Sequence, residues 1–187
     1  TGMRLSQGDK VVSISAVRIR RGRVQNTGAF HTLVNPGRSI PPESVEIHHI
    51  EVHMVADAPS MNEVYPQFAE YAGDSVLVAH NAAFDMKCLQ MAAAEAGLPM
   101  IDNPVLDTLM LSYALHNETE GHSLEAMAER LGITIEGRHS SMGDARATAR
   151  IFIRLLALLP GRGVKSLADA KAFCDQHLLL RWQSSRY

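Results

Sequence analysis

The stretch Ser75-Val76-Leu77-Val78-Ala79-His80-Asn81-Ala82-Ala83-Phe84-Asp85 decides how this chain folds. Its first five residues are mostly apolar and predict a buried strand. The six that follow predict a turn into a helix, with the Asp85 carboxylate near the helix start. A second segment, His139-Ser140-Ser141-Met142-Gly143-Asp144, also ends in an acidic residue at an expected helix start. Two such carboxylates and a loop histidine indicate a metal-assisted hydrolase that needs further acidic ligands.

Outward from this stretch, strands and helices alternate along the chain. Residues 11–20 and 24–34 predict two strands joined by a hairpin turn at Arg21-Gly22-Arg23. Strands followed by alternating helices and short strands indicate an α/β domain with a mixed sheet flanked by helices. We assign residues 1–160 to this domain and residues 161–187 to a C-terminal helical extension. Helices are expected near Pro42–His48 and after Ser60, Phe84, Asp107, Ser123, Gly143 and Ser166, with a tail from Trp182.

Composition narrows the class of protein. The 187 residues are 46% hydrophobic and 20% charged, which is typical of one soluble globular domain. No apolar run approaches the roughly 18 residues of a membrane span. Cys88 and Cys174 form no C-x-x-C pair, so we expect two buried, reduced thiols and a cytoplasmic protein. The net charge of −2 predicts that any nucleic-acid binding is local.

Each candidate residue also has a structural interpretation. Asp85 and Asp144 would stabilise their helices by interacting with the helix dipole, whatever their chemistry. His139 has a side chain suited to general base catalysis, but nine histidines make a chance His-x4-Asp pairing common. We interpret Asp107 as a helix cap rather than a metal ligand. Two groups of arginines are interpreted by default as solvated surface residues. The alternative is that they bind phosphate groups of a nucleic acid. The groups are Arg146, Arg150 and Arg154, and the hairpin arginines Arg18, Arg20, Arg21 and Arg23.

Four segments resemble the DEDDh-type 3′→5′ exonucleases, the group that contains ribonuclease T and the proofreading epsilon subunit of bacterial DNA polymerase III. The resemblance covers about residues 1–158 and implies a ribonuclease-H-like fold. The segments are Thr1-Gly2-Met3, Ile47-His48-His49-Ile50, His80-Asn81-Ala82-Ala83-Phe84-Asp85 and His139-x4-Asp144.

The resemblance implies a mechanism and a set of site residues. Asp85 and Asp144 are implied to bind metal, and His139 is implied to deprotonate the attacking water. Two Mg²⁺ or Mn²⁺ ions would clamp the terminal phosphodiester of DNA or RNA and release nucleoside 5′-monophosphates. The implied partners are a single-stranded or frayed 3′ end, a DNA polymerase and a second copy of the chain. Contacts to the terminal nucleotide are implied for Thr1, Gly2, Met3, His48, Asn81 and Phe84.

Two of these contacts have equally good structural explanations. His48 is as readily interpreted as an ordinary surface histidine, and Asn81 as a turn former. A second copy of the chain, a partner protein and the domain core are all open as the role of the helix after Ser166.

The resemblance also implies two further acids, in an Asp-x-Glu-Thr-Thr-Gly motif at the end of a central first strand. No Asp-x-Glu follows a strand in the 187 residues, and Asp9 and Asp57 have neither partner nor setting for that role. We therefore expect a truncated first strand, with about ten further residues upstream, and little or no activity from this chain. The alternatives are a non-catalytic nucleic-acid-binding or polymerase-associated module, and a different metal phosphoesterase on the same fold.

Overall fold

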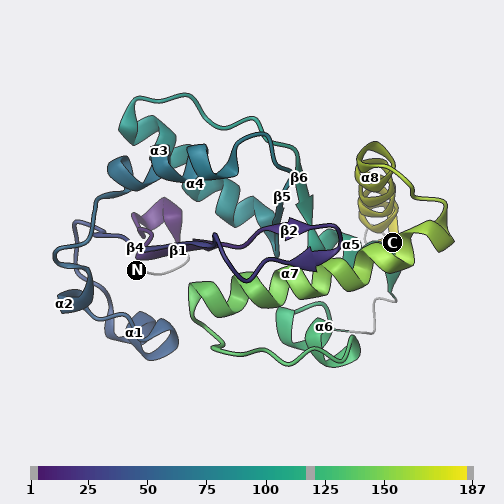
Figure 1. Cartoon of the computed structure of the whole chain (residues 1–187), viewed down its shortest axis with the longest axis horizontal. Coiled ribbons are helices and arrows are strands. Elements are labelled where there is room, and N and C mark those ends of the chain that lie inside the picture. The colour runs from purple at the N-terminus through teal and green to yellow at the C-terminus, as the bar shows by residue number, and fades with distance from the viewer. Residues whose placement is uncertain (1–3, 117–120, 185–187) are drawn as a thin grey trace.

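The computed structural model describes residues 4–116 and 121–184, and Figure 1 shows helices packed around short strands. The expected contacts of Thr1, Gly2 and Met3 lie outside the described residues. Within them, the strands form three two-stranded units. These are β1 (Ser13–Ala16) with β4 (Phe30–Leu33), antiparallel; β2 (Ile19–Arg20) with β3 (Arg23–Val24), antiparallel; and β5 (Leu77–Ala79) with β6 (Val105–Asp107), parallel.

The predicted hairpin is present, but each of its strands is divided in two. Arg21 and Gly22 adopt positive φ angles of 51° and 71°, as a tight two-residue hairpin turn requires. The first strand breaks where the Arg18 guanidinium stacks 4.3 Å from the Tyr71 ring centroid and donates to the Tyr71 carbonyl at 2.6 Å. The second breaks at Gly28, which also has a positive φ of 71°.

β5 lies where the decisive stretch predicts a strand, but it is shorter and less buried than expected. It begins at Leu77, and all three of its residues are half-buried. In the described part of the chain β5 pairs only with β6, matching Leu77 to Val105 and Ala79 to Asp107. Parallel and antiparallel pairing both occur, as expected for a mixed sheet, although the three units are not hydrogen-bonded to one another there.

The predicted helices are present in the predicted order with some boundary differences, and α2 is an additional short helix that the sequence did not predict. α4 and α7 begin before the expected starts. The Ser140 side chain caps α7, whereas the backbone N–H groups at the start of α4 donate to the Asp107 carboxylate. The predicted tail from Trp182 is wrong as far as Ser184, the last described residue, because α8 continues to that point. The helices are α1 (Pro42–His48), α2 (Val52–Val55), α3 (Met61–Ala72), α4 (Ala82–Ala96), α5 (Thr108–Leu115), α6 (Leu124–Arg130), α7 (Ser141–Leu158) and α8 (Leu167–Ser184), with 3-10 turns at Leu5–Gln7 and Leu159–Arg162.

The long helix α7 runs across β1, β3 and β5, as Figure 1 shows, and organises the main core. It buries Ile151 and Leu155 completely, in a cluster that α5 and α6 also join. Ala170 and Cys174 of α8 belong to this cluster, so the C-terminal helix contributes to the same core. Cys88 is half-buried, not buried as expected. No helix in the described ranges is long and apolar enough to cross a membrane.

Candidate active site

Asp107 fixes the turn that precedes Asp85. Its carboxylate accepts hydrogen bonds from three backbone N–H groups: Leu109 at 2.8 Å, Asn81 at 3.0 Å and Ala82 at 2.9 Å. The bond from Leu109 caps α5, and the other two hold the start of α4. The prediction that Asp107 is a helix cap is therefore confirmed, and the same side chain serves a second helix.

Asn81 enters α4 with a left-handed backbone, at φ 63°. Asparagine tolerates this conformation better than most residues, which gives its turn-forming interpretation a physical basis. His80, just before it, lies 3.0 Å from the Thr108 hydroxyl through Nδ1, and that hydroxyl is 3.3 Å from the Ala79 carbonyl oxygen. The carboxyl ends of β5 and β6 are thus tied together beneath the turn.

Asp85 lies in the first turn of α4 and is exposed to solvent. The residue as a whole is exposed, yet burial on its other sides raises the pKa of the carboxyl to about 6, and the nearby Asp107 charge adds to this increase. No basic side chain forms an ion pair with Asp85 among the described residues. Such a carboxylate would be stabilised by a cation. Phe84, its half-buried neighbour, lies on the same turn.

Asp144 lies in the first turn of α7 and, unlike Asp85, has a basic partner. Arg138 Nη1 donates to both of its carboxylate oxygens, at 2.8 and 2.9 Å. The Nε of Arg138 donates to Glu125 on α6 at 2.6 Å. One guanidinium therefore joins the first turns of two helices.

His139 lies in the loop between Arg138 and α7, with an exposed side chain and a left-handed backbone at φ 67°. The Ser140 hydroxyl accepts from the Gly143 N–H at 3.1 Å and caps α7. A Cβ at Gly143 would overlap the backbone carbonyl of Gly137. Glycine at position 143 thus permits the close approach of α7 to the loop that presents His139.

His48 occupies a different setting from that of a surface histidine. It is half-buried at the end of α1, and its Nδ1 accepts from the Ile50 N–H at 3.0 Å. Burial lowers its pKa, and its Nε2 is buried without a hydrogen-bond partner in the described part of the chain. The interpretation as an ordinary surface residue is therefore wrong, while its contact with substrate stays a prediction.

Asp9, which the sequence left without a partner, is also in a structured setting. It is buried and accepts from the Arg4 N–H at 2.9 Å, and Arg38 Nη1 lies 3.9 Å from its carboxylate. These contacts give Asp9 a structural role near the start of the chain.

The carboxylates present fit part of a divalent-cation site. Asp85 and Asp144 offer hard oxygen ligands at two helix starts, and Mg²⁺ is commonly held by one or two carboxylates together with water and phosphate. Within residues 4–116 and 121–184, however, no group of three or more His, Cys, Asp or Glu side chains is arranged to hold a metal ion. Asp85 and Asp144 are therefore candidate single ligands at two separate helix starts, and the described residues do not form a complete two-metal site.

The sequence profile of the family described as Exonuclease (RNase_T) matches residues 1–152. This chain belongs to that exonuclease family. A DNA polymerase III subunit epsilon-like protein of Rhodobacter capsulatus is 49% identical over 179 residues, which are 95% of this exonuclease chain and 25% of the relative. A DNA polymerase III PolC-type protein of Caldanaerobacter subterraneus is 38% identical over 161 residues, covering 86% of this chain and 11% of that protein. The chain thus spans about a quarter or less of these relatives.

Solved structures confirm the ribonuclease-H-like exonuclease fold. Exonuclease X, in complex with 5′ overhanging duplex DNA, superposes with a TM-score of 0.68 at 25% identity, covering 87% of this chain and 90% of that one. The nuclease domain of 3′hExo, a DEDDh family member bound to rAMP, gives a TM-score of 0.68 at 16% identity, covering 79% and 81%. The DEDDh-type resemblance and the α/β fold class expected from the sequence are both confirmed.

The sequence interpretation missed the Glu125–Arg138–Asp144 contacts of this exonuclease chain. Arg138 precedes His139 directly, so its position next to a candidate base was a signal that it belongs to the site. Glu125 gave no comparable signal, since it reads as an ordinary acidic residue in the first turn of α6.

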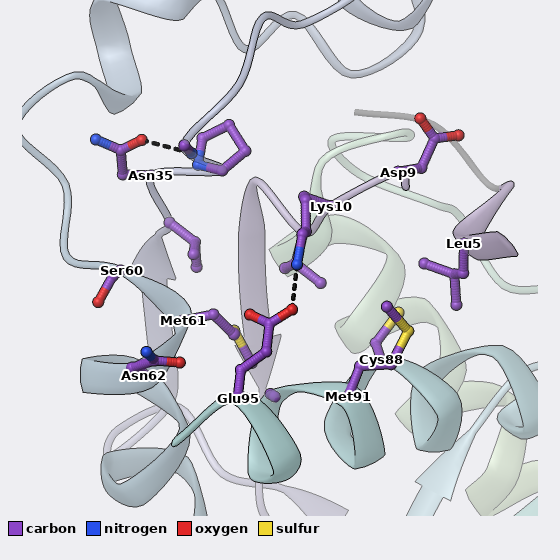
Figure 2. Close-up of a pocket in the computed structure, with 15 residues that line it drawn as sticks. Leu5, Asp9, Lys10, Asn35, Ser60, Met61, Asn62, Cys88, Met91 and Glu95 are labelled. Carbon is purple, nitrogen blue, oxygen red and sulfur yellow. Dashed lines mark hydrogen bonds and ion pairs between the residues drawn. The ribbon is translucent and has the colours of Figure 1, made fainter. Parts of the chain in front are cut away.

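A cavity of about 180 Å³ lies between α4 and the segments around Lys10, Asn35 and Met61, and Figure 2 shows its lining. Leu5, Met61 and Met91 give it apolar walls, and a Lys10–Glu95 ion pair spans it. Cys88 also lines it, but burial raises the pKa of this thiol to about 11, so it stays protonated near neutral pH. Neither Asp85 nor His139 contributes to the lining. The cavity therefore does not contain the candidate acids or the candidate base, although Cys88 is close enough to Asp85 for that charge to raise the pKa of its thiol.

Proposed function

We propose that this chain is the exonuclease domain of a protein that hydrolyses the terminal phosphodiester at the 3′ end of DNA or RNA. The products would be nucleoside 5′-monophosphates. The observation that carries the proposal is the setting of Asp85, a solvent-accessible carboxyl with a raised pKa and no ion-pair partner among the described residues, in a chain of the exonuclease family.

Asp85 and Asp144 are the residues proposed to hold divalent cations, Mg²⁺ or Mn²⁺. Such cations would neutralise charge on the phosphodiester and favour ionisation of the attacking water. His139 would accept the proton of that water, because its imidazole is exposed and imidazole exchanges protons near neutral pH. Asn81 and Phe84, on the turn before Asp85, and His48, at the end of α1, are proposed to contact the terminal nucleotide.

The 187-residue chain by itself is proposed to be inactive or nearly so. It contains two of the four acids that the family resemblance implies, and one of them, Asp144, is paired with Arg138. The second candidate function is therefore a nucleic-acid-binding or polymerase-associated module without catalysis. The pairing of Asp144 and the polymerase names of two relatives favour this alternative.

A nuclease assay with matched substrates tests the proposal. We would compare the 187-residue chain with a version in which a strand ending in Asp-x-Glu-Thr precedes Thr1. The substrates are a 5′-labelled oligonucleotide with a free 3′ hydroxyl and the same oligonucleotide with a blocked 3′ end. The expected result is Mg²⁺- or Mn²⁺-dependent release of mononucleotides by the extended version from the free 3′ end only. Digestion indifferent to the 3′ end would contradict the exonuclease assignment.

The role of His139 is tested in the same assay. His139→Ala in the extended version should lower the rate about 10²–10⁴-fold, the usual contribution of a general base. His53→Ala is the matched control, since His53 is an exposed histidine on α2 with no proposed role. Equal rates for the two variants would remove His139 from the mechanism.

The proposed partner is a nucleic-acid 3′ end, single-stranded or frayed, in the cytoplasm. A DNA polymerase is proposed as a protein partner because two relatives carry polymerase names. A homodimer is a further proposal, and size-exclusion chromatography with light scattering would test it.

A further inference from the structure

Arg138 is shared between two carboxylates in a geometry that suits transfer from one to the other. Its Nη1 donates to both oxygens of Asp144, while its Nε donates to Glu125 Oε1. Different nitrogens of the same guanidinium therefore serve the two acids. Breaking the Asp144 contacts would leave the Glu125 contacts in place.

Solvent reaches all three side chains of this group. The exposed fractions of the side chains are 31% for Arg138, 34% for Asp144 and 52% for Glu125. Exposed ion pairs of this kind contribute little to stability and exchange readily. Glu125 also stays ionised down to acidic pH, since backbone hydrogen bonding and the Arg138 contact lower its pKa to about 2.

We propose that Arg138 is a built-in counter-ion of Asp144 that competes with a divalent cation for its carboxylate and moves wholly onto Glu125 when the cation binds. This inference rests on the proposed function, which assigns Asp144 to the cation. Competition follows because Arg138 Nη1 occupies both Asp144 oxygens, which are the atoms that a hard cation would need.

Removal of the Arg138 charge and removal of the Glu125 charge should change the cation affinity in opposite directions. Removing the Arg138 charge frees Asp144, so the cation should bind more tightly. Removing the Glu125 charge leaves the displaced guanidinium with a neutral and weaker acceptor, so the cation should bind more weakly. A residue that merely joined α6 to α7 would not give opposite signs for the two changes.

Mn²⁺ binding to the 187-residue chain, followed by electron paramagnetic resonance of the free ion, tests the inference without requiring nuclease activity. Arg138→Gln should tighten binding roughly 2–5-fold, the effect of about one partly exposed charge pair. Arg138→Lys keeps the charge but not the fork-shaped contact and should fall between wild type and Arg138→Gln. Glu125→Gln should weaken binding roughly 2–5-fold. Arg146→Gln is the matched control, because Arg146 is an exposed arginine on α7 close to Asp144.

Urea unfolding of each variant separates these effects from a loss of folding. The inference is overturned if Mn²⁺ binding depends on Asp144 but Arg138→Gln changes the affinity no more than Arg146→Gln does. It is also overturned if Glu125→Gln and Arg138→Gln shift the affinity in the same direction. Mn²⁺ binding that is indifferent to Asp85→Asn and Asp144→Asn, or absent from wild type and Arg138→Gln alike, would overturn the cation assignment and this inference together.

Discussion

Replacing Asp107 by alanine should destabilise the domain more than any ordinary loss of a surface aspartate. The Asp107 carboxylate receives three backbone N–H groups at 2.8–3.0 Å, which belong to the starts of α4 and α5. Loss of one N-cap side chain costs about 0.5–2 kcal/mol. Since two helix starts lose their acceptor at once, we expect the free energy of unfolding of Asp107→Ala to fall by about 2–3 kcal/mol.

Asp107→Asn should separate geometry from charge. The amide oxygen can keep the contacts that Oδ1 makes with Asn81 and Leu109, but the NH₂ group would face the Ala82 N–H, so we expect a loss of about 1 kcal/mol. The substitution also removes a negative charge that raises the pKa of Asp85, so that pKa should fall toward its ordinary value.

Urea unfolding followed by circular dichroism measures the stability of both variants, and carboxyl NMR titration measures the pKa of Asp85. Asp102→Ala is the control, as Asp102 is an exposed aspartate in the loop before β6. The double-cap explanation is refuted if Asp107→Ala loses no more stability than Asp102→Ala. The charge explanation is refuted if Asp107→Asn leaves the pKa of Asp85 unchanged.

Three further predictions follow from the site. Gly143→Ala should lower stability by about 1–3 kcal/mol in urea unfolding, because the added methyl group overlaps the Gly137 carbonyl, whereas Gly161→Ala, which meets no atom, should cost less. His139→Gly should be about 1 kcal/mol more stable than His139→Ala, since only glycine relieves the left-handed backbone; equal stabilities would exclude strain there. Asp85 binds its proton more tightly in the folded state, so its contribution to stability falls as pH rises from about 4 to about 6. Asp85→Asn should flatten the pH dependence of stability across that window and stabilise the protein at pH 7 by no more than about 1 kcal/mol after solvent screening, as thermal unfolding at each pH would measure.

Local signals made much of the fold predictable. Ser60 and Glu63 predict the start of α3, and the Glu63 carboxylate does accept from the Ser60 N–H at 2.8 Å. Gly22 predicts the hairpin turn, because glycine adopts a positive φ angle without a steric cost. Boundaries were less accurate. Whether α8 ends before or after Trp182 depends on weak helix propensities that differ by fractions of a kcal/mol.

The sequence gives a set of candidate site residues but not their arrangement. Asp85, His139 and Asp144 were identified because their spacing and their positions near helix starts are visible along the chain. The contacts that surround these residues were not identified, because they join distant positions. Asp107 lies 26 residues after Asn81, and Glu125 lies 13 residues before Arg138. Contacts of this kind form only when separate elements pack together.

The sequence by itself therefore determined the order of the main strands and helices and the resemblance to the exonuclease family. It also identified Asp85 as the acid that follows the turn after β5. Periodicity and capping act over a few residues, so they can be read without knowing the packing. Only the tertiary structure decided that Asp85 is open to solvent with a raised pKa, while Asp144 is neutralised by Arg138. Asp85 and Asp144 both lie in the first turn of a helix, but their electrostatic environments differ because the tertiary fold places different charged groups beside them.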